Sequence, residues 1–160
     1  MTTRLTRRIA VTAALLTLGG GVALASATAA GADGTLRLTT VVGVNTDLDL
    51  GAPGSSAGDV QVFRDDVLRG GRPVGIATGS CQLTELTATR LVGSCTATLV
   101  FSDGSSLTAQ GAFQEDPSVG PSGYRWAVTG GTGRYSGASG TVTGEFVPDT
   151  DRVDVTIRLR

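Results

Sequence analysis

The sequence predicts an all-β fold in which eight short antiparallel strands close into a barrel. Apolar and polar residues alternate with a period of two along most of the chain, and helical periodicity is nearly absent. Glycine accounts for 24 of the 160 residues, about twice its usual share of ~7%. The two cysteines, Cys81 and Cys95, both fall within one predicted hairpin.

The alternation defines the strands one after another. It is clearest in residues 153–159, and it also runs through residues 95–101 and 107–113 on either side of the Asp103-Gly104 turn. Other connections carry comparable turn sequences, such as Gly70-Gly71 and residues 148–151. The predicted strands span about residues 35–44, 58–68, 73–85, 90–101, 106–114, 123–129, 140–147 and 152–160.

Eight short antiparallel strands in one domain leave two main architectures, a closed barrel and a sandwich. Closure removes exposed strand edges, and an eight-stranded barrel encloses just enough room for side chains or one small ligand. A disulfide between the sheets of a sandwich would join cysteines far apart in the sequence. The cysteines of this chain lie in one hairpin, so the barrel is favoured.

The two cysteines are predicted to form a disulfide. A hairpin centred on Ala88 places Cys81 opposite Cys95, and opposed residues of an antiparallel pair lie at about disulfide range. A reactive thiol would need a neighbouring histidine or a CxxC motif, and the chain has neither. We therefore interpret both cysteines as structural.

Residues 1–30 resemble a secretory signal peptide. Arg4, Arg7 and Arg8 form a positive start, an apolar segment follows, and small residues between 25 and 30 offer cleavage sites. The alternative is a retained membrane anchor, but residues 19–21 are glycines that interrupt an apolar run already short of a bilayer span. The mature domain is then 31–160, secreted by the general or the twin-arginine pathway and not bound to a membrane.

Charge and composition exclude several functions. After removal of the leader, ten arginines face fourteen acidic residues, and the chain contains no lysine or histidine. This balance argues against nucleic-acid binding, which needs a basic face. The lack of histidine excludes histidine-based triads, histidine-ligated zinc and a haem held by a proximal histidine. Two D-x-D stretches, 47–49 and 149–151, do not continue as calcium loops, so neither a metal nor a cofactor is expected.

The glycine-rich segment 130–140, GGTGRYSGASG, is the most distinctive motif. A strand-like stretch follows it, which argues against a phosphate-binding loop, since that loop opens a helix. Residues 128–140 resemble the V-x-G-G-T-G-x-F/Y-x-x-A-R-G signature of dirigent and allene oxide cyclase-like proteins, with Ser139 where plant members usually have Arg. Residues 58–66 and 71–75 resemble a second block of that family.

The resemblance implies an eight-stranded antiparallel barrel of the calycin-like kind, in agreement with the strand count. It also implies a function without a cofactor, in which an apolar pocket guides the stereoselective cyclisation or coupling of a small apolar molecule. A non-catalytic small-molecule binder and a secreted interaction module with a filled core are the alternatives. The sequence assigns no catalytic residue, and it leaves the oligomeric state open, a homo-oligomer included.

Three aromatic residues are the candidates for a ligand pocket. Trp126 and Tyr124 lie on one face of a predicted strand just before the glycine-rich segment, and Phe101 ends another strand. An indole offers apolar area and one N–H donor that needs a partner when buried. Ordinary core packing is the alternative for all three residues.

Overall fold

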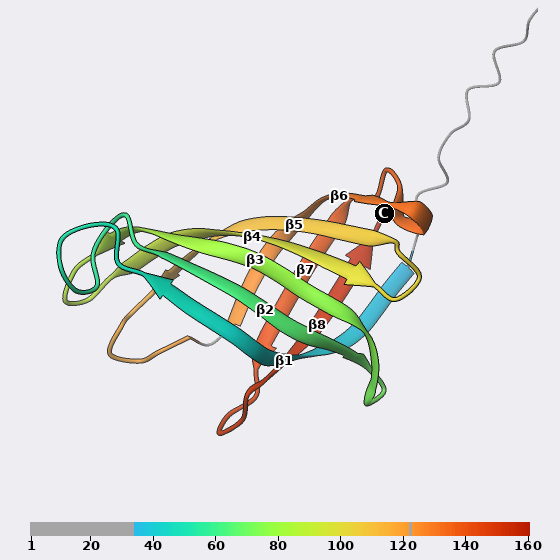
Figure 1. Ribbon diagram of the computed structural model, residues 1–160, viewed down its shortest axis with the longest axis horizontal. Coiled ribbons are helices and arrows are strands. Elements are labelled where there is room, and N and C mark those ends of the chain that lie inside the picture. Colours follow the sequence, from blue (N-terminus) through green and yellow to red (C-terminus); the bar gives the residue numbers. More distant parts are fainter. Residues whose placement is uncertain (1–33, 122) are drawn as a thin grey trace, which may run out of the picture.

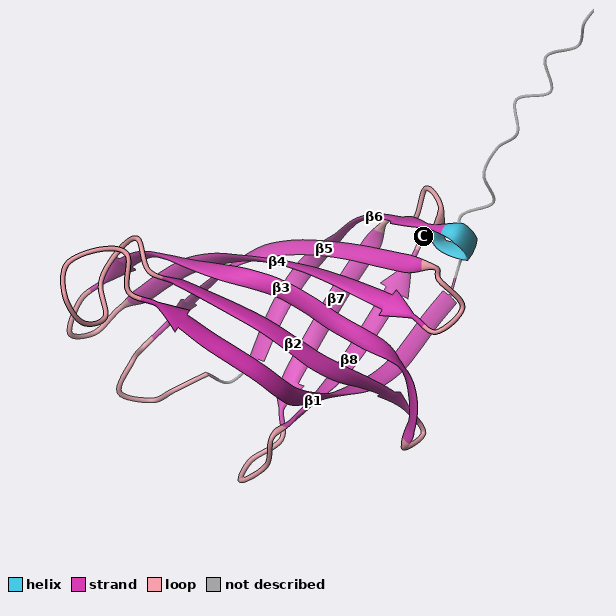
Figure 2. Ribbon diagram, in the orientation of Figure 1, coloured by secondary structure: helices cyan, strands magenta, loops and turns pink. Residues whose placement is uncertain are grey.

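The computed structural model describes residues 34–121 and 123–160. In these residues, eight antiparallel strands form a closed barrel in which each strand pairs with the next along the chain and β8 pairs with β1 (Figure 1). Figure 2 shows that strands are the main secondary structure of the described chain, joined by loops and one short helix. The elements are β1 (Gly34–Leu48), β2 (Val60–Arg69), β3 (Arg72–Leu86), β4 (Leu91–Phe101), β5 (Ser106–Glu115), β6 (Gly123–Thr132), the 3₁₀ helix η1 (Gly133–Tyr135), β7 (Gly140–Phe146) and β8 (Arg152–Leu159).

The predicted all-β barrel is confirmed, and the strand limits agree to within a few residues except in β1. That strand continues to Leu48 although residues 45–47 are polar. The extension forms because Asn45 to Leu48 pair with Phe63 to Val60 of β2 beyond an irregularity between Val42 and Val44. Cross-strand pairing thus overrides the weak β-propensity of Asn and Asp.

The two ends of the barrel differ. The connections β1–β2, β3–β4, β5–β6 and β7–β8 lie at one end, which we call the open end. The connections β2–β3, β4–β5 and β6–β7 lie at the other, the closed end, together with η1 and the C-terminus (Figure 1). The largest fully buried side chains are Val67, Leu107 and Ile157, and each lies in the half of its strand nearer the closed end.

The glycine-rich segment closes that end. Tyr135 of η1 is buried, and its ring centroid lies 5.1 Å from that of Phe101. The Arg134 guanidinium lies over both rings, 5.0 Å from the Phe101 centroid and 4.8 Å from the Tyr135 centroid, and it forms an ion pair with Asp103 at 2.9 Å. Gly133 has φ +60°, a left-handed conformation that glycine adopts without a steric penalty. The motif therefore forms a turn, and its Tyr135 side chain fills the closed end of the barrel.

The Cys81–Cys95 disulfide is present and joins β3 to β4, with the two Cα atoms 4.0 Å apart. The hairpin turn itself is centred one half-residue beyond Ala88, because Leu86 pairs with Leu91. An irregularity between Leu83 and Glu85 shifts the register and brings Cys81 opposite Cys95. The pairing prediction is confirmed, and an extra residue in β3 explains why it holds with a displaced turn.

The predicted signal peptide, residues 1–30, lies outside the described residues, and its cleavage stays a prediction. Within 34–121 and 123–160, no helix is long and apolar enough to cross a membrane.

We predict that the disulfide contributes about 3 kcal/mol to the free energy of unfolding, because it closes a loop of about 15 residues. The double variant Cys81→Ala/Cys95→Ala should lose that amount in urea unfolding. Alkylation of the native protein, followed by intact-mass measurement, should modify neither cysteine until a reductant is added. Two alkylated thiols in the unreduced protein would contradict the assignment.

Candidate functional site

The barrel contains a cavity of about 660 Å³ that reaches its rim at the open end. Inward-facing side chains of all eight strands line it, and loop residues such as Gly54, Ser55 and Pro121 form its rim. On β3, β4 and β5, five of the ten residues that line the cavity are small and leave part of the lumen unfilled. These are Ala77, Cys81, Cys95, Ala97 and Ala109.

Trp126 and Tyr124 each lie against a glycine of a neighbouring strand, with ring atoms in the space that a side chain on that glycine would need. A Cβ atom added to Gly111 of β5 would lie 2.1 Å from Cδ1 of Trp126. A Cβ added to Gly144 of β7 would lie 2.3 Å from Cε1 and Cζ of Tyr124, the residue with which Gly144 pairs. Any side chain at these two glycines would push the rings away from the wall.

The same arrangement occurs at two phenylalanines of the cavity wall. Gly79 of β3 pairs with Phe63 of β2, and its added Cβ would lie 2.8 Å from Cζ of the ring. Gly93 of β4 pairs with Phe113 of β5, with the corresponding distance 2.3 Å. Four rings therefore occupy the space that side chains on glycines of neighbouring strands would need.

Tyr124 and Trp126 stack on each other, with ring centroids 4.2 Å apart and an interplanar angle of 24°. Phe146 of β7 meets the Tyr124 ring edge-on at 6.3 Å. Trp126 is only 9% exposed, and its buried Nε1 has no hydrogen-bond partner among the described residues. An unpaired buried donor costs about 1–3 kcal/mol, so the indole is not in its most stable environment.

The structure brings together two of the three residues predicted for a pocket. Trp126 and Tyr124 line the cavity. Phe101 does not line it: it is the last residue of β4 and packs on Tyr135 at the closed end. Strand alternation gave the correct inward direction for Phe101, but it carries no information about height along the barrel. Sequence reasoning missed the wall residues Phe63, Phe113 and Phe146, since their grouping depends on cross-strand register.

Ionisable groups extend into the apolar part of the cavity. Burial raises the pKa of the Asp65 carboxyl, against a weaker lowering by the backbone N–H of Gly43, whose nitrogen is 3.4 Å from Oδ1. Burial likewise raises the pKa of Glu115. Burial, reinforced by the charge of Asp65, raises the pKa of Tyr124 to about 12. Tyr124 is thus a neutral phenol at physiological pH.

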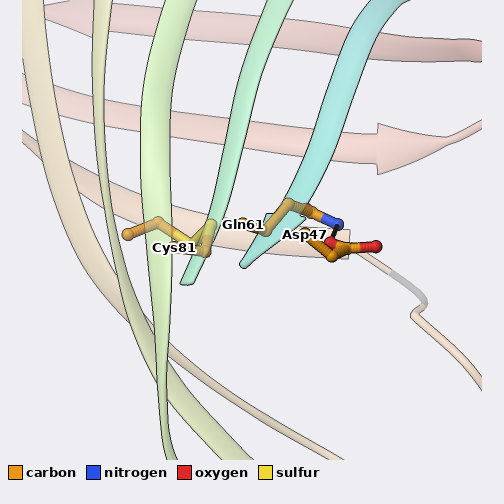
Figure 3. The surroundings of a disulfide bond; sticks show 4 residues. Asp47, Gln61 and Cys81 are labelled. Carbon is orange, nitrogen blue, oxygen red and sulfur yellow. Dashed lines mark hydrogen bonds between the residues drawn. A yellow bond between two sulfur atoms is a disulfide. The ribbon is translucent and has the colours of Figure 1, made fainter. Parts of the chain in front are cut away.

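Three other carboxylates at the rim accept hydrogen bonds from β2 and from the loop between β1 and β2. Asp47 accepts a hydrogen bond from Nε2 of Gln61 at 3.0 Å, close to the disulfide (Figure 3). Asp49 accepts one from the Gly54 backbone N–H at 3.0 Å. Asp59 accepts hydrogen bonds from three backbone N–H groups, the shortest 2.7 Å from Ser56, and that bond is the largest cause of its lowered pKa.

The cavity is suited to positioning an aromatic or otherwise apolar molecule. It offers stacked rings and aliphatic walls, the Tyr124 hydroxyl as a hydrogen-bonding group, and the Asp65 and Glu115 carboxyls as proton acceptors or donors. Among the described residues, no group of three or more histidine, cysteine or acidic side chains could hold a metal ion.

The sequence matches the allene oxide cyclase barrel like domain over residues 38–159. The chain belongs to this family. No curated protein matches it. Within the family signature, Ser139 is exposed at the closed end, where its carbonyl oxygen accepts a hydrogen bond from the Arg160 N–H. The departure from the plant pattern is therefore outside the cavity lining.

Solved structures agree with the family assignment. The barrel is similar to a pyocyanin demethylase, with 26% identity and a TM-score of 0.68 over 79% of this chain and 99% of that one. It is also similar to a pterocarpan synthase dirigent protein (19%, TM-score 0.60, 79% and 86%). An exo-specific intermolecular Diels-Alderase gives 16% identity, a TM-score of 0.58 and coverage of 81% and 98%. The last two likenesses support the fold alone.

The raised pKa of Tyr124 predicts that this allene oxide cyclase-like barrel loses stability in alkali. Below pH 10 the phenol is protonated in both the folded and the unfolded chain, and it adds no pH dependence. Between pH 10 and about 12 the unfolded chain releases this proton first, so the free energy of unfolding falls by about 2–3 kcal/mol.

Urea unfolding of the wild type and of Tyr124→Phe at pH 8, 10 and 12 measures this contribution. In Tyr124→Phe the free energy of unfolding should fall less between pH 10 and 12, by about 2–3 kcal/mol. Identical pH profiles for the two proteins would mean that the phenol ionises normally in the folded barrel.

Proposed function

We propose that the protein is exported, binds a small apolar molecule in the barrel cavity, and guides a stereoselective cyclisation or coupling of that molecule. The observation that carries the proposal is the open, aromatic-walled cavity of about 660 Å³, since ligand pockets typically enclose ~300–1,000 Å³ and are mostly apolar. The cavity also argues against an interaction module with a filled core.

Guidance would come from restricting the shape of the bound molecule. A flexible substrate held between the Tyr124–Trp126 stack and the rest of the cavity wall can adopt few conformations. Holding reacting groups in a near-attack geometry lowers a barrier by several kcal/mol without a nucleophile or a cofactor. Asp65 and the Tyr124 phenol would add hydrogen bonds to developing charge.

Relatives of the fold support this class of function. The similar structures include a demethylase, a pterocarpan synthase dirigent protein and a Diels-Alderase, so this architecture accommodates several reactions on organic molecules. Fold does not determine function, and a non-catalytic binder would share the binding step. Turnover of a co-purified ligand, extracted from the exported protein and identified by mass spectrometry, distinguishes the two.

Export is the second part of the proposal. The three-part pattern of residues 1–30 supports it, and so does the disulfide between Cys81 and Cys95, because disulfides persist in oxidising compartments outside the cytosol.

Trp126 is the only tryptophan, so its fluorescence reports on the cavity wall. We expect a neutral apolar probe, N-phenyl-1-naphthylamine, to quench or shift this emission. Trp126→Phe should weaken binding of the probe about three- to tenfold, because part of the stacked surface is lost. The variant should retain the wild-type free energy of unfolding or exceed it, because the unpaired Nε1–H is removed.

Phe101→Leu is the matched control, since it reduces a ring at the closed end, outside the cavity lining. In its folded state it should bind the probe with wild-type affinity. Binding that leaves the Trp126 emission unchanged, or that weakens only in Phe101→Leu, would exclude the proposed site.

A further inference from the structure

The charged groups on the cavity wall are all of one sign. Five acidic residues line the cavity, and no arginine among the described residues does. The chain contains no lysine or histidine. The acidic residues are Asp47, Asp49, Asp59, Asp65 and Glu115.

Two of these five carboxylates form no short hydrogen bond that stabilises the fold. Asp47, Asp49 and Asp59 hold Gln61 and the backbone of the loop after β1. Asp65 accepts a single long hydrogen bond, 3.4 Å from the Gly43 nitrogen. For Glu115, burial raises the pKa and no hydrogen bond from the described residues opposes it. The ion pairs of the described chain involve Asp66, Glu85 and Asp103 instead.

Partly buried carboxylates are costly where burial removes water and little replaces it. In both residues the pKa is raised by burial, as expected for such an environment. The charge of Arg64 lowers the pKa of Asp65, but burial has the larger effect. Asp65 also raises the pKa of Tyr124, which places its charge within electrostatic reach of the stacked pair. The pair itself includes a nine-tenths buried indole whose N–H has no partner among the described residues.

A ring system bearing a positive charge matches both the stacked pair and the carboxylates. Its flat face can stack on the Tyr124–Trp126 pair, and a cation over an aromatic face is attracted to it. Its charge would be compensated by Asp65 and Glu115. A carboxylate or phosphate ligand would meet only like charges, and a cavity without a basic side chain could not compensate it.

We propose that the cavity selects aromatic cations, such as N-alkylated or protonated nitrogen heterocycles, and rejects anionic ligands. This inference rests on the proposed binding function and specifies its ligand class. It assigns Asp65 and Glu115 the role of counter-charge, with the Tyr124–Trp126 stack as the surface that receives the ring.

The test uses three probes of nearly the same shape: N-methylquinolinium, 1-methylnaphthalene and 1-naphthoate. Their dissociation constants are measured by calorimetry at one pH and one low salt concentration, since screening weakens such charge effects. The wild type should bind the cation and the neutral probe, and it should bind 1-naphthoate at least tenfold more weakly than the neutral probe.

Single substitutions test which residues cause the preference for a cationic ligand. Asp65→Asn and Glu115→Gln should each weaken N-methylquinolinium about tenfold and leave 1-methylnaphthalene within about twofold. Asp66→Asn is the matched control: it removes the same charge one residue away, where the carboxylate pairs with Arg64 at 2.8 Å and does not line the cavity. It should leave all three affinities unchanged.

The possible outcomes distinguish a failure of the binding function from a failure of the cation preference. If no probe binds, the proposed binding function fails together with this inference. If 1-methylnaphthalene binds but 1-naphthoate binds equally well or better, the cation preference is wrong and the binding function stands. Loss of cation affinity in Asp66→Asn equal to that in Asp65→Asn and Glu115→Gln would show a general charge effect and would overturn the assignment.

Discussion

The barrel interior stays open because aromatic rings on the cavity wall lie over glycines of adjacent strands. An eight-stranded barrel is narrow, and its interior is normally just filled by side chains. In this protein ring atoms of Trp126 and Tyr124 occupy the space that side chains on Gly111 and Gly144 would need, so each ring lies beside a residue without a side chain. Small residues on β3, β4 and β5 leave part of the lumen unfilled. The same glycines therefore allow the rings to pack on the wall and the cavity to stay open.

The two ends of the barrel have different roles: the closed end stabilises the fold, and the open end carries the candidate site. At the closed end the glycine-rich segment supplies the Tyr135 plug, and Arg134 ties it to Phe101 and Asp103. The open end carries the loop held by Asp59 and Asp49, with the cavity beneath it. The motif that identifies the family is thus part of the scaffold. The residues that would choose a ligand lie elsewhere, which allows one fold to serve different substrates.

Much of the fold could be predicted because alternation and turn chemistry are local properties. The eight antiparallel strands and the Cys81–Cys95 pair follow from them. The candidate site depends on register and on height along the barrel axis, which local patterns do not carry. Alternation directed Phe101 inward correctly but could not place it at the closed end. Asp65 lies within β2 and faces the cavity, and no pattern in the sequence marked it as a wall residue.

The claim on which the rest depends is that glycine–aromatic pairing keeps the lumen open, and a crystal structure of Gly111→Ala tests it most directly. The new methyl group would lie 2.1 Å from Cδ1 of Trp126. We predict that the indole turns into the lumen and that the cavity becomes smaller than about 660 Å³. Gly130→Ala on the neighbouring strand, where the added Cβ meets only Thr108 Oγ1 at 3.4 Å, should leave the cavity unchanged. An indole that keeps its position in Gly111→Ala, beside a cavity of the original size, would contradict this explanation of the open lumen.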